Sequence, residues 1–391
     1  MIKGIFCHDL PIFKDVNGVY CSTTLTNDIF SRYLNVVDEL LVATRVYTIT
    51  NTYSEAHQEK IDLPGLRFLD LPNVNKTTAL FKEIPQAKKL LRKAMEAVDL
   101  VFIRGGTVAM LGASIARKLH KPYLLECGGC AWDSLWNHSL KGKLVAPYYE
   151  YRAKKDAKKA SHVLYVTQKW LQNRYPSKGI SIGVSDVFIE DNDVTLLENR
   201  FSKITCKSVS DPFILGTAAG LVKYKRQQDI IKVIAKLKDK FNLRYEIVGG
   251  GDETYLRNVA KKYGVAERVL FKGQLKHAEI LEWMKTIDLY AQPSFQEGLP
   301  RALVEAMSCA CPAIGSNIAG IPELLQPEMI FKAGDVNGIC KILMHMDEQT
   351  LRQSAEYNFK KAKDFLPGVL DVKRKDFFTD YKNFVLGNSV Q

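Results

Sequence analysis

Two glutamates, Glu297 and Glu305, lie eight residues apart in a segment whose residue types could bind a phosphorylated ligand. Residues 294–308 read Ser-Phe-Gln-Glu-Gly-Leu-Pro-Arg-Ala-Leu-Val-Glu-Ala-Met-Ser and follow an apolar run. This order predicts a strand, a loop that contains glycine, and a helix with Pro300 at its first position, where a missing N–H costs nothing. The unpaired amides of the first helical turn and the helix dipole would attract a phosphate group, and Arg301 would add positive charge.

The two carboxylates would bind the two ends of such a ligand. A fully helical path between them would span about 12 Å, which approximates the length of a nucleotide-sugar. Carboxylates accept hydrogen bonds from hydroxyl groups, which both ends of this ligand offer. Pairs of helix glutamates at this spacing are common, so the prediction rests on the loop and the helix around them. The segment therefore predicts a site for a sugar joined to a nucleotide through a diphosphate.

The elements that must position these residues follow one pattern along the whole chain. Short β-branched runs alternate with longer amphipathic stretches, which is typical of parallel sheets flanked by helices. The pattern predicts strands at residues 2–7, 40–46, 100–103, 122–126, 163–167, 213–218, 244–248, 269–272, 288–292 and 312–315. It predicts helices at residues 23–33, 86–97, 108–119, 145–159, 227–240, 253–263, 278–285 and 301–309, with a helical tail over residues 336–386.

This alternation predicts an α/β protein with two doubly wound, Rossmann-like domains. We expect the domains to face a central cleft, because such sheets bind ligands at the carboxyl ends of their strands. We place the first domain at residues 1–196, the second at residues 197–366 and a C-terminal segment at residues 367–391. Residues 191–211 lose the periodicity and gather Asn, Ser and Lys, so we expect either a linker or the entry to the second domain there.

Further short motifs follow one another in the second half. They are Gly220-Leu-Val-Lys-Tyr-Lys225, Val248-Gly-Gly-Gly-Asp252, Val269-Leu-Phe-Lys-Gly273 and Gly320-Ile-Pro-Glu323. Together with residues 294–308 they resemble the donor-binding motifs of the family-4 glycosyltransferases, which are retaining enzymes of the GT-B fold with a Glu-x7-Glu signature. The resemblance covers the whole second half. It implies a GT-B fold in which a C-terminal helix crosses back and packs on the first domain.

The resemblance implies a role for each matching residue of the Glu-x7-Glu segment. Glu297 would bind hydroxyls of the transferred sugar, and Glu305 would bind the ribose. Gly298, Leu299 and Arg301 would offer amides to the sugar and the diphosphate.

The other motifs would complete the donor site. Lys225 would pair with a phosphate, Gly250 would lie in a glycine turn beside the donor, and Lys272 would end the strand that runs along the base. The sequence departs from the family at Gly220, where relatives often have an arginine. Lys223 or Arg226 would have to replace that cation.

The first half resembles the family more loosely, as expected if it binds a variable acceptor. Glu126 ends a strand where many relatives carry a histidine or an acid facing the reacting sugar, so we count it with Glu297 and Lys225 as a catalytic candidate. Gly18 lies in the first strand–helix loop, where the family brings its backbone close to the diphosphate. Further candidates, each of which could instead be a cap or a turn residue, are His8, Asp9, Asp133 and His138.

Composition excludes several classes of protein. The 391 residues are 46% hydrophobic and 25% charged, as in globular proteins with large cores. No apolar run reaches the roughly 18 residues that a membrane helix needs, and the first residues do not resemble a secretory signal. We therefore expect a cytoplasmic protein whose eight cysteines are reduced thiols.

The positive charge is spread over the chain but has one local concentration. The net charge is +12, and residues 141–178 hold ten basic side chains against Glu150 and Asp156. This stretch is either a solvated helix face or a surface that meets a phosphorylated acceptor or anionic lipid, which would make the protein peripheral at the inner face of the cytoplasmic membrane. Nucleic acid is not expected as a partner, because no recognition module is present. Basic and aromatic residues that would form a lipid-facing surface are Lys154, Lys155, Lys158, Lys159, Trp136, Tyr148, Tyr149 and Tyr151.

Three patterns resemble metal or cofactor sites. Cys127 and Cys130 lack the second ligand pair of a structural zinc site, and the glycines between them favour a tight turn over a redox pair. Asp191-Asn-Asp193 imitates a metal-binding motif but falls in the expected linker. The glycines at residues 249–251 do not have the spacing of a dinucleotide fingerprint. We expect neither a metal nor a cofactor, with the nucleotide-diphosphate sugar bound as a substrate.

The resemblance to the family implies a metal-independent, retaining hexosyltransferase. It would move a sugar from a nucleotide-diphosphate donor, with UDP favoured, to a glycan or lipid-linked acceptor. Relatives with the Glu-Gly-Leu-Pro-Arg variant often assemble bacterial surface polysaccharides. The alternatives are a nucleotide-sugar epimerase of the same fold and a non-catalytic accessory subunit, although such subunits typically lose the donor-site acids that are present here.

Overall fold

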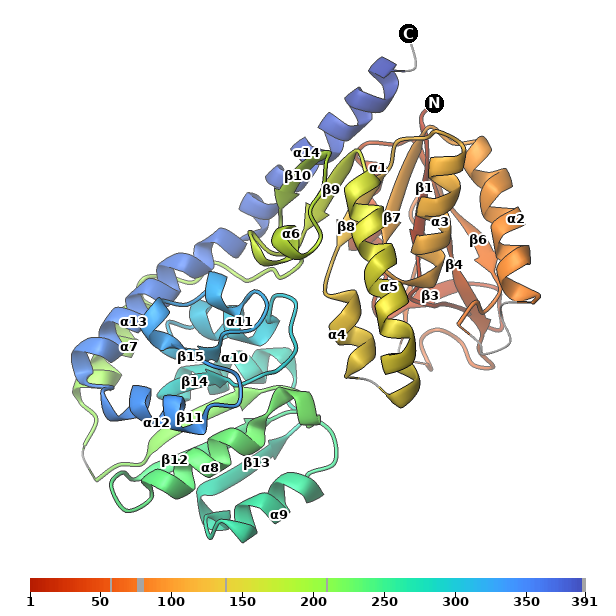
Figure 1. The fold of residues 1–391 in the computed structure, drawn as a ribbon. Helices are drawn as coiled ribbons and strands as arrows, with labels where there is room; N and C mark the ends of the chain where they lie inside the picture. Colours follow the sequence, from red (N-terminus) through yellow and green to blue (C-terminus); the bar gives the residue numbers. More distant parts are fainter. Residues whose placement is uncertain (57, 76–80, 138, 209, 389–391) are drawn as a thin grey trace. The chain divides into compact units, whose positions relative to one another are not determined.

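The computed structural model describes residues 1–56, 58–75, 81–137, 139–208 and 210–388. These residues form two compact α/β units, each with its own sheet (Figure 1). The first unit contains Met1–Leu135, Leu140–Val184 and Asp371–Gln391, and the second contains Trp136–Ser139 and Ser185–Leu370. The chain therefore returns to the first unit in its C-terminal helix.

The first unit is built on one sheet. Its described strands follow the order β10-β9-β8-β7-β1-β4-β2-β3-β5, and β6 also pairs with β4. The pairings from β10 to β2 and the β4–β6 pairing are parallel, whereas β3 is antiparallel to both β2 and β5. The strands are β1 (Lys3–His8), β2 (Ile12–Lys14), β3 (Tyr20–Ser22), β4 (Glu39–Thr48), β5 (Glu59–Lys60), β6 (Leu66–Leu71), β7 (Leu100–Arg104), β8 (Leu124–Cys127), β9 (His162–Tyr165) and β10 (Ile180–Gly183). The helices are α1 (Asn27–Leu34), α2 (Glu83–Glu96), α3 (Gly106–Lys118), α4 (Ala131–Trp136), α5 (Leu140–Lys159), α6 (Trp170–Arg174) and, from Asp371 on, α14 (Pro367–Asn388).

The two faces of this sheet bury different side chains, because successive residues of a strand point to opposite faces. Ile5 of β1 joins an aliphatic core with residues of α2, α3 and α5. Its neighbour Phe6 joins an aromatic layer that includes Tyr33 of α1. In the same layer Phe378 of α14 lies with its ring centroid 5.4 Å from that of Tyr33 and 5.6 Å from that of Phe102 in β7.

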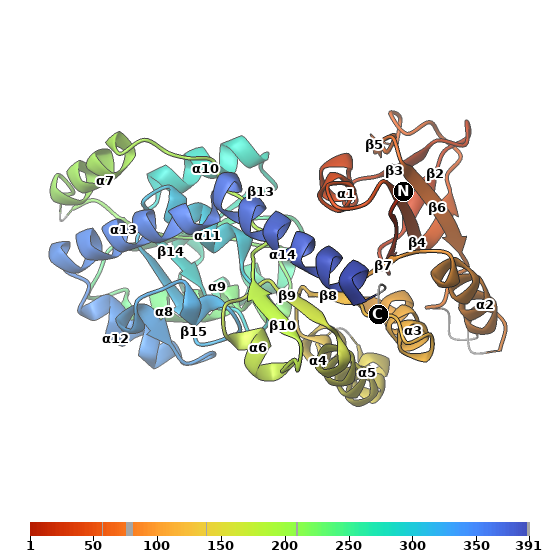
Figure 2. The same ribbon diagram turned by 90° about the horizontal axis from the view of Figure 1, so that it is seen from above.

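Polar contacts also fix α14 to the first unit. The Tyr381 hydroxyl accepts a hydrogen bond from the Val101 N–H at 3.0 Å. Asp380 Oδ2 lies 3.2 Å from Nε2 of His162 in β9, and burial lowers the pKa of that histidine. Figure 2 shows α14 running beside β9. The prediction that the C-terminal helix crosses back onto the first domain is confirmed.

The second unit is a doubly wound domain on a parallel sheet. Its strand order is β13-β12-β11-β14-β15-β16, so the chain starts near the middle and adds strands to both edges. Helix α8 packs against α9 and α12, whereas α11 packs against α10 and α13. The strands are β11 (Phe213–Ala218), β12 (Leu243–Val248), β13 (Val269–Gly273), β14 (Leu289–Gln292), β15 (Ala313–Ser316) and β16 (Ile330–Phe331). The helices are α7 (Thr195–Thr205), α8 (Gln227–Leu237), α9 (Thr254–Lys262), α10 (His277–Thr286), α11 (Arg301–Ser308), α12 (Val336–Met344) and α13 (Glu348–Ala362), with short 3₁₀ helices η1 (Lys223–Lys225), η2 (Ala266–Arg268), η3 (Ile321–Glu323), η4 (Pro327–Met329) and η5 (Lys363–Phe365).

The predicted class of two Rossmann-like α/β domains is confirmed, and two local regions differ in detail from the expectation. Residues 191–211 contain helix α7 and belong to the second unit, so they are the entry to that unit. Leu197 of α7 packs in an apolar cluster with Ala355 and Phe359 of α13, and Arg200 adds polar contacts. The Arg200 guanidinium is buried and donates to the carbonyl oxygens of Ile287 at 2.6 Å and Met284 at 2.9 Å. The first strand–helix connection was expected to be a loop, yet it contains the antiparallel pair β2 and β3.

In the described residues, no helix is long and apolar enough to cross a membrane.

Candidate functional site

The carboxyl edge of the second sheet brings Glu297 and Lys225 together. Glu297 lies five residues after the end of β14, and Lys225 ends the 3₁₀ helix η1 that follows β11, the neighbouring strand. Their side chains form an ion pair in which Lys225 Nζ lies 2.7 Å from Glu297 Oε1. The Glu297 side chain is only 8% exposed and that of Lys225 is 21% exposed, so the pair is largely shielded from water.

The two loops that carry this pair are also joined through their backbones. The Phe295 N–H donates to the Tyr224 carbonyl at 2.7 Å, next to both members of the pair. Gln292, the last residue of β14, donates from Nε2 to Glu297 Oε1 at 2.7 Å. One carboxylate oxygen of Glu297 therefore accepts hydrogen bonds from both the Lys225 ammonium group and the Gln292 amide group. Sequence reasoning did not identify Gln292.

Helix α11 begins at Arg301, directly after the glycine-bearing loop. Pro300 was expected at the first helical position, but it is the N-cap residue, with φ −73° and ψ 112°, and provides no side-chain cap. The Arg301 side chain is exposed and Leu299 is half-buried. The Gly298 carbonyl accepts a hydrogen bond from the Gly320 N–H at 3.0 Å, which joins this loop to the Gly-x-Pro-Glu turn.

Glu305 lies on α11 and is bonded to a histidine that sequence reasoning missed. Its side chain is buried, and its Oε1 lies 3.1 Å from Nε2 of His277, the first residue of α10. His277 is mostly exposed, so this contact lies at the surface end of the buried carboxylate. No local motif connects the two residues, which are 28 positions apart; only the packing of α10 on α11 brings them together.

Gly250 lies in a tight turn at the same edge of the sheet. Its carbonyl accepts from the Leu221 N–H at 3.0 Å, which fixes the turn against the loop that leads to Lys225. The preceding Gly249 has φ +147°, and a Cβ there would lie 2.0 Å from the Ala219 carbonyl oxygen. Only glycine fits this position, because the two loops approach each other so closely.

Lys272, in β13, pairs with a buried acid of the neighbouring strand. Its Nζ lies 3.5 Å from Oε2 of Glu246, which also accepts from Trp283 Nε1 at 2.8 Å. Lys272 is thus held by its own sheet.

The two residues that could replace the missing cation at Gly220 differ in their contacts. Arg226 donates from Nε and Nη2 to the carboxylate of buried Asp229, at 2.7 and 2.9 Å, and its guanidinium lies 4.3 Å from the Phe295 ring centroid. Lys223 is exposed, with Nζ 5.8 Å from the Tyr255 ring centroid. Lys223 therefore has the freer ammonium group.

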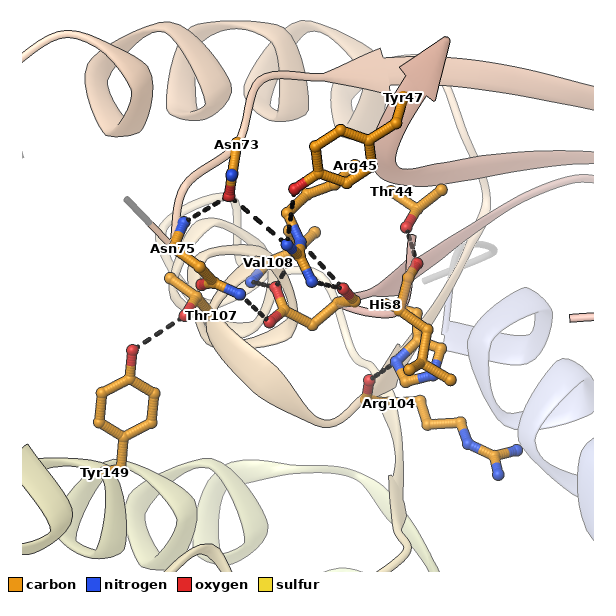
Figure 3. A network of polar contacts seen from close by, with 12 residues as sticks. His8, Thr44, Arg45, Tyr47, Asn73, Asn75, Arg104, Thr107, Val108 and Tyr149 are labelled. Carbon is orange, nitrogen blue, oxygen red and sulfur yellow. Dashed lines mark hydrogen bonds and ion pairs between the residues drawn. The ribbon is translucent and has the colours of Figure 1, made fainter. Parts of the chain in front are cut away.

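In the first unit, Asp9 caps a helix rather than standing free. Its Oδ1 accepts from the Val108 N–H in the first turn of α3 at 3.0 Å, and its Oδ2 accepts from Asn75 Nδ2 at 2.7 Å. The Asp9 backbone carbonyl accepts from Arg45 Nη2 at 2.6 Å, and Figure 3 shows this network. The carboxylate occupies the N-terminus of α3, where a phosphate would otherwise be attracted.

The neighbouring candidates His8 and Glu126 are buried in the same unit. His8 Nδ1 bonds the Arg104 carbonyl (Figure 3), and burial together with the nearby Arg104 charge lowers the pKa of His8 to about 4. Glu126 accepts one hydrogen bond from the Tyr33 hydroxyl and one from Arg104 Nη1 at 3.3 Å. Both oxygens of the Glu126 carboxylate are thus engaged inside the unit.

Gly18 and Asp133 have local structural roles. Gly18 lies in the turn between β2 and β3 with φ +77°, and its N–H donates to the Asp15 carbonyl at 3.0 Å. Asp133 lies in the first turn of α4, where its N–H is 3.4 Å from Cys130 Sγ. His138 lies outside the described residues.

The remaining patterns from the sequence are also placed. Cys127 and Cys130 are free thiols, and burial raises the pKa of Cys127 to about 12. Asp193 Oδ1 accepts from the Thr195 N–H at 2.9 Å in the turn that leads into α7. Among the described residues, no group of three or more His, Cys, Asp or Glu side chains could hold a metal ion.

Comparisons with known proteins show the family of the chain. Residues 201–359 match the family model described as glycosyl transferases group 1. The Staphylococcus aureus protein named CapJ is 30% identical over 395 residues, which cover 97% of this chain and 96% of that protein.

Two solved structures show the same fold over nearly the whole chain. The sucrose-phosphate synthase from Thermosynechococcus elongatus superposes with a TM-score of 0.66 at 14% identity, covering 97% of this chain and 99% of that one. HepE from Anabaena, solved in complex with UDP and glucose, gives a TM-score of 0.61 at 18% identity, with coverage of 97% and 99%. These structures are GT-B glycosyltransferases, which confirms the expected fold class. On the family model and the full-length similarity to CapJ, this chain belongs to the group 1 glycosyl transferases.

Proposed function

We propose that the protein is a retaining glycosyltransferase of the family-4 type that uses a UDP-sugar as its donor. The observation that carries this proposal is the ion pair of Lys225 and Glu297 at the carboxyl edge of the second sheet, with Glu305 on the helix that follows. Ligands of doubly wound sheets bind at this edge. A cation on the segment after β11 and two acids on the loop and helix after β14 match the groups of a nucleotide-diphosphate sugar.

The donor-site residues divide between the two ends of the donor. Glu297 binds hydroxyls of the transferred sugar, and Lys225 binds the diphosphate next to it. Glu305 binds the ribose hydroxyls, with His277 beside it. The amides of Gly298, Leu299 and Arg301 face the sugar and the diphosphate, and the turn at Gly250 and the strand end at Lys272 border the nucleotide.

Catalysis is electrostatic in this proposal. As the sugar leaves, negative charge develops on the diphosphate, and a preorganised ammonium group and helix-terminal amides stabilise it without reorganisation. Lys225 supplies the ammonium and the start of α11 supplies the amides, so no metal ion is required. The acceptor attacks the face from which the diphosphate departs, and the configuration of the sugar is retained.

Glu126 acts indirectly in this scheme. Its carboxylate is 4% exposed and accepts hydrogen bonds from Tyr33 and Arg104. We propose that it orients Arg104, whose side chain is 20% exposed, rather than touching the sugar itself.

Support for UDP as the nucleotide comes from HepE, a protein of the same fold solved with UDP and glucose. The acceptor in our proposal is a glycan or a lipid-linked glycan of a surface polysaccharide. It is met at the cytoplasmic face of the membrane, which the protein contacts without inserting.

The surface of helix α5 supports this membrane contact. Leu140 and Leu144, four residues apart, are 81% and 83% exposed, and Tyr148 and Tyr151 continue the exposed row along the helix. The last turns of the same helix carry exposed Lys154, Lys155, Lys158 and Lys159. An apolar row beside basic side chains is typical of helices that lie in the interface of an anionic membrane. Tyr149 does not belong to this face, because its hydroxyl bonds Thr107 Oγ1 at 2.9 Å (Figure 3).

Two other functions are distinguished by their products. A nucleotide-sugar epimerase of the same fold would release an altered sugar without any acceptor. An accessory subunit would bind a partner transferase and process no donor. The presence of both Glu297 and Glu305 favours the transferase over the accessory subunit.

The test is a thermal-shift screen of nucleoside diphosphates and their sugars, followed by NMR of the products. A ligand that binds only the folded protein raises its melting temperature, so UDP and one UDP-sugar should raise it most. Slow donor hydrolysis should release the sugar with the anomeric configuration of the donor. An inverted anomer would refute the retaining mechanism, and an epimerised sugar would favour the epimerase.

A further inference from the structure

A buried chain of hydrogen bonds leads from the core of the second unit to Glu297. It begins at Tyr290 in β14, which is fully buried, and passes through Gln292 two residues later. The Tyr290 hydroxyl donates to Gln292 Oε1 at 3.0 Å. Gln292 Nε2 donates to Ser294 Oγ at 3.0 Å and to Glu297 Oε1 at 2.7 Å. Every polar group of the Gln292 amide is therefore paired.

The chemistry of the neighbours fixes the orientation of this amide. Burial raises the pKa of Tyr290 well above its ordinary value, so its hydroxyl keeps its proton and acts as a donor. If the amide were turned over, its oxygen would face the carboxylate oxygen of Glu297, and two acceptors would meet. Only the observed orientation gives the buried groups partners of the opposite kind.

The Glu297 carboxylate is consequently bound through only one of its two oxygens within the described residues. Both Lys225 Nζ and Gln292 Nε2 lie 2.7 Å from Oε1. Within the described part of the chain, no hydrogen bond reaches Oε2. A carboxylate anchored at one oxygen presents the other in a fixed direction.

We infer that Gln292, oriented by Tyr290, is a positioning residue that anchors Oε1 of Glu297 and so leaves Oε2 as the atom that accepts a hydroxyl of the transferred sugar. The part that concerns the sugar rests on the proposed function. The part that concerns the anchoring rests on the hydrogen bonds alone.

The experiment has one arm that needs no substrate. The melting temperatures of Gln292→Leu, Glu297→Gln and the double variant are measured without nucleotide. Two residues in direct contact give non-additive losses, so the double variant should lose less than the sum of the single losses. Additive losses would overturn the anchoring.

The second arm measures donor hydrolysis. The wild type is first tested with UDP-glucose, UDP-galactose and UDP-N-acetylglucosamine, and kcat and KM are then measured for the donor that it hydrolyses fastest. Gln292→Leu should lower kcat about ten- to a hundredfold, as expected for a lost hydrogen bond to a charged group, with UDP affinity within about twofold of wild type. The matched control is Gln228→Leu, which removes another buried glutamine of the same unit, one whose Oε1 has no hydrogen-bond partner among the described residues. It should leave kcat unchanged.

The Gln292→Glu variant tests the positioning role through the pH dependence of activity, which a purely structural role would not change. The new carboxyl group can donate to Glu297 Oε1 only while it is protonated, so activity should fall as the pH rises. The charged and titratable groups of this network are Glu297 and Tyr290, which contact the side chain at position 292, and Lys225, which pairs with Glu297. Glu305 and Tyr245 act electrostatically on Tyr290. Burial raises the pKa of Tyr290 and of Tyr245, so these tyrosines do not produce this fall. A pH profile like that of the wild type would overturn the inference.

The outcomes separate the two claims. If the wild type hydrolyses a donor and Gln292→Leu keeps its kcat, the positioning role is wrong and the proposed function stands. If the wild type hydrolyses none of the three donors while the melting temperatures are non-additive, the anchoring stands, and the sugar contact fails together with the proposed function.

Discussion

Lys225 and Glu297 form an ion pair, with Nζ 2.7 Å from Oε1, although they come from loops 72 residues apart in the sequence. Each largely buried charge is stabilised by the other. In the proposed site the lysine faces the diphosphate and the glutamate faces the sugar. The pair therefore joins the two parts of the donor between which the bond breaks.

Replacing Lys225 by Ala should lower kcat by about a hundred- to a thousandfold, the usual cost of removing one group that stabilises charge in the transition state. UDP affinity should also fall, because the ammonium contacts the diphosphate in the bound state as well. Steady-state kinetics and calorimetry with UDP would measure both effects. Lys236→Ala is the matched control, since Lys236 is an exposed lysine of the same unit that bonds Asn337. Activity unchanged by Lys225→Ala would exclude this lysine from catalysis.

Chelation should leave the transferase active. Because Lys225 and the start of α11 are proposed to carry the diphosphate charge, excess EDTA should reduce the rate by less than about twofold. The assay is donor turnover before and after EDTA treatment and after Mg²⁺ or Mn²⁺ is added back. A large loss that either ion restores would mean that a metal takes the role given to the lysine.

The alternation of apolar and amphipathic runs was sufficient to predict the strands and helices that carry the donor site. Residues 213–218 and the helix that follows η1 lie where the pattern indicates, because β-branched runs and 3.6-residue periodicity reflect burial on one side. Helix α7 is harder to predict from the sequence because a polar contact of Arg200 accompanies the apolar contacts of Leu197. Arg200 bonds backbone carbonyls of the sheet and its loops, and a buried arginine looks in the sequence like an exposed one.

The residues that orient the two site acids could not be predicted in the same way. Gln292 ends an ordinary buried strand, and its role appears only when the loop folds back to place Glu297 against it. His277 meets Glu305 because α10 packs on α11, a tertiary contact without a local signal. The acids themselves were found because their spacing and loop are local features of the sequence.

His8 makes the stability of the first unit depend on pH. Its pKa is lowered from 6.5 to about 4 by burial, so the folded protein keeps it neutral while the unfolded chain takes up a proton below pH 6.5. The free energy of unfolding therefore keeps its full value above about pH 6.5 and decreases as the pH falls towards 4. The lowered pKa corresponds to about 3 kcal/mol in total, of which about 2 kcal/mol is lost between pH 7 and pH 5.

Urea unfolding of wild type and His8→Gln at pH 7 and pH 5 would measure this difference. The variant should lose about 2 kcal/mol less than the wild type over that interval. His345→Gln, which removes an exposed histidine, should behave like the wild type. Equal losses in His8→Gln and the wild type would show that His8 also titrates normally in the folded protein.

The exposed face of α5 should bind anionic vesicles. Because the Debye length is about 8 Å at physiological ionic strength and shorter above it, binding should be measurable at low salt and lost near roughly 0.5 M salt. Replacing Lys154, Lys155, Lys158 and Lys159 by glutamate should remove it in a vesicle sedimentation assay. Leu140→Ser with Leu144→Ser should weaken it without changing the charge.

Two controls accompany the vesicle assay. All variants should keep the UDP affinity of the wild type, because the substitutions lie in the first unit and the proposed donor residues in the second. Neutral vesicles should not bind the wild type. If the wild type ignores anionic vesicles even at low salt, a soluble acceptor becomes the better hypothesis.

The central claim is that Glu297 and Glu305 bind opposite ends of one nucleotide-diphosphate sugar, and calorimetry of UDP binding tests it most directly. UDP lacks the sugar, so Glu297→Ala should keep UDP affinity within about twofold of wild type while it abolishes transfer. Glu305→Ala should lower UDP affinity about tenfold or more, because it removes an acceptor for the ribose hydroxyls. Equal losses of UDP affinity in the two variants, or no binding of UDP by the wild type, would contradict the account.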